Sequence, residues 1–251
     1  MSGHSKWSTI KHKKGALDAK RGKLFSKLSK LIITAARNGG GDPDMNLPLR
    51  YAIDKAKAAN MTKDTIERAV KKGTGDLEGA QIEELLYEGY APGGVALMVE
   101  ALTDNRNRTA PEIKKILENR GGSLGATNCV GWMFSSKGVF RVDASKITED
   151  KLMEIALDAG AEDLQRDGDG FEVTCEPTAF HEVQQALQDA GIEPELAEIQ
   201  RVPSTTVKLD RDQAAKVLAL IENLEDHEDV QNVYSNFDVD EKILEELASS
   251  S

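Results

Sequence analysis

The sequence has little of what metalloenzymes and secreted proteins depend on. It has two cysteines and four histidines in 251 residues, too few for a disulfide scaffold or a cysteine-rich metal site, and this usage fits a reducing compartment. The first residues have no apolar segment of the signal-peptide kind, and the longest apolar runs, such as 31–36 and 95–99, are far too short to span a bilayer. We therefore expect a cytoplasmic protein with no membrane segment, no metal and no other cofactor.

Motifs of the common enzyme classes are also missing. The sequence has no G-x-x-x-x-G-K-[ST] loop, no H-E-x-x-H and no paired C-x-x-C. A G-x-S-x-G string occurs at 121–125, but a nucleophilic serine needs a strand before it and a helix after it, and here the expected order is reversed. We predict no catalytic residues. An enzyme acting at Ser123 or at the loop around Arg106 remains the weakest of three hypotheses.

What the chain does have is charge, and that charge is unevenly distributed. The formal net charge is -11, yet residues 1–75 hold 17 Lys and Arg against 6 Asp and Glu, a balance of +11, which leaves -22 for residues 76–251. The excess of basic residues is larger still in residues 1–37, relative to their number, with ten Lys and Arg and a single acid, Asp18. This asymmetry predicts a basic module that binds a polyanion, carried on an acidic body.

The basic module is predicted to be an arm followed by a three-helix bundle. Residues 2–15 have few apolar side chains to bury, so we expect an arm that is flexible or is ordered by a partner. Apolar residues spaced three and four apart predict helices over 18–38 and 48–60, and a third helix from Thr62 as N-cap to Gly73. In the first helix, lysines recur on the face opposite the apolar stripe.

The acidic body is predicted to hold two α/β units. Residues 135–203 give the order β-α-β-β-α-β, which is typical of ferredoxin-like domains, with a tight Asp-Gly hairpin at 167–170. Residues 80–134 and 204–238 flank this unit and are expected to form a second one, with 130–134 as one of its strands. The predicted class is therefore α+β: an N-terminal three-helix bundle (1–75) plus two ferredoxin-like α/β domains, one inserted into the other. Three sequential domains are the alternative.

Two groups of residues are candidates for binding nucleic acid. The first is the arm with the first helix, whose cations suit phosphate and whose Trp7 could stack on an unpaired base. The second precedes a predicted helix, where free N–H groups and arginine side chains favour an anion. Each group also has a plainer interpretation. The first group would be a solubilising basic face with Trp7 buried in the bundle. The second would be a helix cap whose arginines pair with carboxylates. The candidates are Lys6, Trp7, Lys11, His12, Lys13, Lys14, Lys20, Arg21, Lys23, Lys27 and Lys30, then Asn105, Arg106, Asn107 and Arg108.

Several strings in the sequence resemble the YebC family. They are GHSKW at 3–7, IKHKK at 10–14, DAKRGK at 18–23, GGGDP at 39–43, YEGY at 87–90, PGG at 92–94 and TDNRNRT at 103–109. The resemblance extends to about Asn236 and implies one helical and two α/β domains. It also implies a variable tail at 239–251, which we expect to fray. Members of the family are usually labelled probable transcriptional regulators that bind DNA. Mitochondrial relatives resemble translational activators for a cytochrome oxidase subunit, and bacterial relatives are implicated as ribosome-associated factors that relieve stalling, notably at proline runs.

The sequence and this resemblance together favour a ribosome-associated translation factor that relieves stalling. The basic module would hold ribosomal RNA, and residues 105–108 would contact RNA or a tRNA end. The alternative is a DNA-binding transcriptional regulator. The third helix offers mainly Lys63, Arg68, Lys71 and Lys72, which suit phosphate more than base edges. A monomer is expected in either case.

Overall fold

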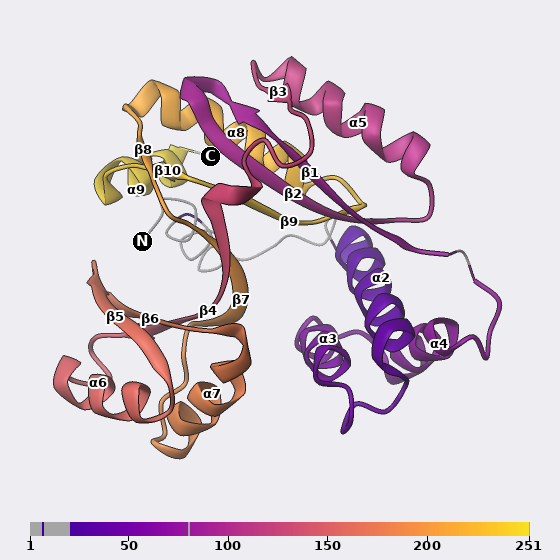
Figure 1. The fold of residues 1–251 in the computed structure, drawn as a ribbon, viewed down its shortest axis with the longest axis horizontal. Coiled ribbons are helices and arrows are strands. Elements are labelled where there is room, and N and C mark those ends of the chain that lie inside the picture. The colour runs from indigo at the N-terminus through magenta and orange to yellow at the C-terminus, as the bar shows by residue number, and fades with distance from the viewer. Residues whose placement is uncertain (1–6, 8–20, 80, 251) are drawn as a thin grey trace.

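The protein consists of three helices followed by two α/β units (Figure 1). The structure, a computed structural model, describes residue 7, residues 21–79 and residues 81–250. Both sheets of four strands are antiparallel. The predicted α+β class, with a helical N-terminal region and two mixed α/β domains, is confirmed.

The helical region contains α2 (Arg21–Gly39), α3 (Leu47–Ala58) and α4 (Lys63–Thr74). Ile32, Leu49 and Ala56 are fully buried where the three helices meet. Capping fixes the helix limits: the Asn46 side chain accepts the N–H of Leu49 at 3.2 Å, and the predicted Thr62 cap is confirmed by its bond from the N–H of Thr65. The three predicted helices are therefore present, although the predicted start at residue 18 lies outside the described residues.

The larger α/β unit has the strand order β3-β1-β2-β9, with α5 and α8 packed on one face. Its elements are β1 (Glu83–Ala91), β2 (Val95–Thr103), α5 (Arg106–Asn119), β3 (Ser123–Leu124), α8 (Arg211–Glu225) and β9 (Val230–Ser235). A tight turn joins β1 directly to β2, with Gly93 and Gly94 at φ of +82° and +76°. The chain order is therefore β-β-α-β-α-β, which differs from the expected second ferredoxin-like order because no helix separates the first two strands. A small parallel pair, β8 (Val207–Lys208) with β10 (Phe237–Asp238), lies beside this unit.

The smaller α/β unit has the strand order β5-β6-β4-β7, which is the ferredoxin-like arrangement predicted for it. Its elements are β4 (Phe134–Asp143), α6 (Glu149–Asp158), β5 (Ala161–Asp167), β6 (Gly170–Cys175), α7 (Phe180–Asp189) and β7 (Leu196–Pro203). Gly168, at φ +57°, makes the predicted hairpin turn. The chain leaves the first sheet after β3 and rejoins it at β9. The limits predicted for each domain stay a prediction.

The strand predicted over 130–134 is wrong. Residues Gly131–Met133 form a turn of 3-10 helix, and Phe134 already belongs to β4. The N–H groups of Val130 and Gly131 donate to the carboxylate of Glu88 at 2.8 and 2.7 Å, so they are not available to a strand ladder. The missing strand is β3 instead, which pairs with Gly89 and Tyr90.

The expectation that the tail frays is also wrong. Residues Glu241–Ser250 form a helix, α9. Leu244 is fully buried, and Ile243 and Leu247 pack against the same apolar core that α5 and α8 cover. These three positions lie one, three and four residues apart, so they share one helix face. Burying that face is what holds the tail against the larger unit.

Candidate nucleic-acid interface

Asp229, just before β9, joins the two predicted groups of binding residues. Its Oδ2 accepts hydrogen bonds from Arg108 Nη2 at 2.8 Å and from Thr109 Oγ1 at 2.7 Å, and its Oδ1 pairs with Lys30 Nζ. The Asp229 side chain is 1% exposed. Burial alone would raise the pKa of this carboxyl, but the bonds from Arg108, Lys30 and Thr109 hold it well below its ordinary value. Asp229 is therefore ionised, and it holds α2 against the start of α5.

The lysines of α2 point toward the C-terminal end of α8. Lys23 Nζ donates to the carbonyl of Asp226 at 3.2 Å, and Lys27 Nζ donates to the carbonyl of Glu225. The last carbonyls of a helix have no partner within the helix and carry partial negative charge, so lysine ammonium groups stabilise them. Three lysines predicted to bind phosphate thus make contacts within the chain, and phosphate binding by them stays a prediction.

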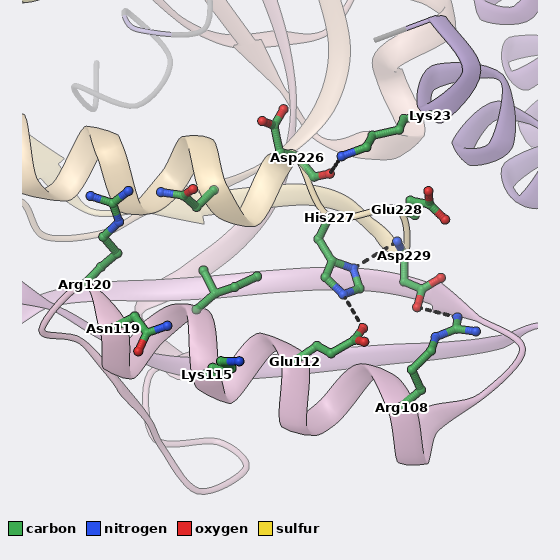
Figure 2. A pocket seen from close by; sticks show the side chains of 12 residues that line it. Lys23, Arg108, Glu112, Lys115, Asn119, Arg120, Asp226, His227, Glu228 and Asp229 are labelled. Carbon is green, nitrogen blue, oxygen red and sulfur yellow. Dashed lines mark hydrogen bonds and ion pairs between the residues drawn. The ribbon is translucent and has the colours of Figure 1, made fainter. Parts of the chain in front are cut away.

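A cleft of about 880 Å³ opens between α5 and the end of α8 (Figure 2). One face of α5 lines it with residues spaced three and four apart, and Lys23 of α2 reaches its other side. Acidic groups gather near Asp229, and the cations Lys115 and Arg120 lie toward the end of α5. The lining is Lys23, Arg108, Glu112, Lys115, Ile116, Asn119, Arg120, Asn223, Asp226, His227, Glu228 and Asp229.

His227 in this cleft has a fixed tautomer. Its Nδ1 accepts the backbone N–H of Asp229 at 3.1 Å, so the proton of the neutral ring is on Nε2, which donates to Glu112 Oε2 at 2.9 Å. Figure 2 shows the imidazole held between these two partners. Both ring nitrogens are occupied, so the ring serves as a structural brace and is not poised as a general base.

Trp7 does not lie where the sequence prediction placed it. Its side chain is 4% exposed and belongs to the core of the larger α/β unit, with residues such as Leu97, Ile221 and Phe237. A ring in this position has no free face for a base, which contradicts the predicted stacking role. The alternative, burial in the helical bundle, is also incorrect, because the burying residues come from the other unit. Lys6, Lys11, His12, Lys13, Lys14 and Lys20 lie outside the described residues, as does the side chain of Arg21.

The predicted group at 105–108 forms the first turn of α5. Asn105 is the N-cap, and its side chain accepts the N–H of Arg108 at 3.2 Å. Arg106 lies 3.8 Å from Glu83, and Arg108 pairs with Asp104 as well as Asp229. Asn107 is exposed. The plainer interpretation of a helix cap with paired arginines describes these contacts, and binding by the group stays a prediction.

The sequence prediction missed several residues of the cleft. Lys115, Asn119 and Arg120 share a face with Arg108 at helical spacing, so the pattern of the predicted helix contained enough information to find them. Asp229 carried no such local pattern. Its side-chain partners Lys30 and Arg108 lie 199 and 121 positions away, and acids are common around it.

The described part of the chain has neither a helix long and apolar enough to cross a membrane nor a group of three or more potential metal ligands. Its fold is that of an α+β protein with a helical N-terminal region and two mixed α/β domains. A family model for the N-terminal domain of TACO1/YebC proteins matches residues 5–76, and a model for their second and third domains matches residues 82–237. The chain therefore belongs to the TACO1/YebC family, a family of regulatory proteins that are not enzymes.

Similar proteins match nearly the whole length of the chain. A probable transcriptional regulatory protein of Natranaerobius thermophilus is 52% identical over 98% of this chain and 99% of its own length. Another from Geotalea uraniireducens is 53% identical over 98% of this chain and its full length. The crystal structure of a conserved hypothetical protein from Aquifex aeolicus, 48% identical, superposes with a TM-score of 0.79 over 89% of this chain and 92% of the other.

Proposed function

We propose that this chain is a nucleic-acid-binding regulator of gene expression that acts as a monomer in the cytoplasm. The observation that carries the proposal is the separation of charge, +11 in residues 1–75 against -22 in the remainder. Part of the positive charge is exposed on α4, at Lys63, Arg68, Lys71 and Lys72. Exposed lysine and arginine side chains bind phosphate groups and release the counterions condensed on the nucleic acid. The acidic body would limit this contact to one side of the molecule.

The finer assignment best supported is a DNA-binding transcriptional regulator. The relatives at 52–53% identity are described as probable transcriptional regulatory proteins. In such a protein, the exposed face of α4 would contact the DNA backbone. Sequence discrimination would come from a smaller set of base contacts or from DNA shape.

A ribosome-associated translation factor is the second candidate. The observation that favours it is that α3 and α4 contain no Asn or Gln, the side chains that read adenine edges, and offer Arg50 and Arg68 as their two arginines. A surface of this composition suits sequence-independent contact with ribosomal RNA. In this case the arm would hold ribosomal RNA, and residues 105–108 would lie near RNA or a tRNA end.

The experiment that separates these candidates is cross-linking in cells, followed by sequencing of the attached nucleic acid. Enriched promoter DNA supports the transcriptional regulator, and enriched ribosomal RNA supports the translation factor. If the protein cross-links to neither and binds no nucleic acid at physiological salt, the proposed function is wrong.

Charge-reversal variants show whether the basic module carries the binding. Changing Lys63, Lys71 and Lys72 to Glu is expected to lower nucleic-acid affinity about tenfold or more, because several phosphate contacts are lost. The matched control changes three exposed lysines of the acidic body, Lys151, Lys208 and Lys216, to Glu. The control alters net charge by the same amount. Equal losses in both variants would show that net charge, and not the location of the cations, governs binding.

A further inference from the structure

Helices α3 and α4 both pack against α2 and leave a hollow between them (Figure 1). The hollow has a volume of about 760 Å³. It is bounded by both helices, by the loop before α3 and by the link between α3 and α4. It shares no lining residue with the cleft beside α5, so it is a separate feature of the surface.

The floor of this hollow is apolar. Met61 and Ile66 line it and are 5% and 7% exposed. Ile53 and Val70 line it as well and are half-buried. All four side chains are aliphatic or a thioether, so a flat apolar group that entered the hollow would release water from apolar surface on several sides, which is favourable.

Three exposed lysines line the same hollow: Lys57 of α3, and Lys63 and Lys71 of α4. Lys57 Nζ lies 3.4 Å from Asp54, and Lys63 Nζ lies 3.6 Å from Glu67. All four of these paired side chains are more than half exposed. Ion pairs in water contribute little to stability, so both lysines can turn from their carboxylates toward an anionic ligand. An apolar floor with ammonium groups around it suits a ligand that is flat and apolar at one end and anionic at the other.

Lys71 connects the hollow to the other cations of α4. Arg68 precedes Lys71 by three residues and Lys72 by four, so the three side chains are neighbours on the helix surface, and all are exposed. A strand whose phosphates follow these cations therefore passes the hollow. Asn60, which is exposed at φ +60°, also lines it, and its amide offers a donor and an acceptor to the edge of a base. The continuous row of cations and this amide favour a nucleotide over an acidic protein segment.

We propose that the hollow between α3 and α4 receives one unpaired base of a bound nucleic acid, while the adjacent phosphates contact Lys63 and Lys71. This inference rests on the proposed nucleic-acid-binding function and specifies the group recognised, a nucleotide that has left the base stack. Proteins hold extruded bases between apolar side chains and contact their edges with polar groups. Extrusion costs least for a base that is already unpaired, so a duplex with a bulged base is the preferred ligand over an intact one.

Affinity measurements with labelled duplexes test the proposal. The probes are a short DNA duplex with one bulged adenine, the intact duplex of the same sequence, and the corresponding two RNA duplexes. Wild-type protein is expected to bind the bulged member of at least one pair about tenfold more tightly than the intact member. Val70→Phe fills the hollow without changing the charge and is expected to lose this preference. The matched control is Ala58→Phe, at an exposed position that does not line the hollow, and it is expected to keep the preference.

The fluorescence of 2-aminopurine supplies the second readout, because its emission rises when the base leaves the stack. With 2-aminopurine as the bulged base, wild-type protein is expected to raise the emission, and Val70→Phe is expected to raise it much less. With 2-aminopurine paired in the intact duplex, little change is expected. A preference for the bulge that survives in Val70→Phe, or an equal rise in emission with that variant, would overturn the proposal.

The two possible failures can be told apart. If wild-type protein binds bulged and intact duplexes equally well, the role of the hollow is wrong and the proposed function stands. If it binds neither, both are wrong. A short peptide of alternating Glu and Leu tests an acidic protein partner: if it binds wild-type protein more tightly than the bulged duplexes do, and Val70→Phe abolishes its binding, the hollow does not serve a nucleotide. Circular dichroism and the melting temperature of each variant show whether it folds as the wild-type protein does.

Discussion

Helices α2 and α4 lie in the same basic region, and each carries cations at helical spacing, yet their cations do different things. Lys23, Lys27 and Lys30 of α2 contact the end of α8 and Asp229. Lys71 and Lys72 of α4 are exposed. The comparison teaches that charge counted along a sequence measures what a segment could bind, whereas the fold determines which of those charges remain available to a partner.

The largest expected effect comes from neutralising the Asp229 carboxylate, which pairs with Lys30 of α2. Asp229→Asn is expected to destabilise the folded chain by about 3 kcal/mol, because Lys30 and Arg108 lose their shared carboxylate while Lys30 stays largely buried. Denaturant unfolding followed by circular dichroism measures this. The control is Asp212→Asn, whose carboxylate is 87% exposed and is expected to change stability by less than about 0.5 kcal/mol. Equal effects would show that Asp229 has no special role.

Acid is expected to have a related but more gradual effect. The folded state lowers the pKa of Asp229, so its stabilisation is complete at neutral pH. As the pH falls below about 4, the ordinary value for Asp, that stabilisation is progressively lost. Unfolding midpoints measured from pH 7 to pH 2.5 should therefore decline less in Asp229→Asn than in the wild type. Parallel declines would contradict the prediction.

The smallest expected effect is on the salt dependence of nucleic-acid binding, and it distinguishes α4 from α2. Lys71→Gln is expected to reduce the slope of log affinity against log salt by about 1, the contribution of one phosphate contact. Lys27→Gln is expected to leave that slope unchanged, because Lys27 already donates to Glu225. Nucleic-acid titrations at four salt concentrations measure both slopes. A reduced slope for Lys27→Gln would place α2 in the interface and remove the contrast between the helices.

Local patterns in the sequence were sufficient for much of the fold. Apolar spacing predicted α2, α3 and α4, and alternation with an Asp-Gly turn predicted the ferredoxin-like unit. The prediction failed where distant groups decide the conformation. Strand β3 has two residues, too few for a pattern, and the turn after it follows the carboxylate of Glu88, about 40 positions earlier.

The candidate site was harder to predict for the same reason. The N-terminal segment has few apolar residues, so nothing near Trp7 indicated that a core formed by residues 91–244 would bury it. Composition predicted a polyanion-binding module but did not show which of its cations remain exposed.

The contact between α2 and Asp229 also fixes the orientation of the helical region relative to the larger unit. In addition to the chain connection to β1, Lys30 and Arg37 attach this region to the larger unit at two points, Asp229 and the carbonyl of Ile82. With these attachments, the exposed cations of α4 stand at a set separation from the acidic side chains of the larger unit. A polyanion bound to α4 would therefore lie at one fixed distance from that negative charge.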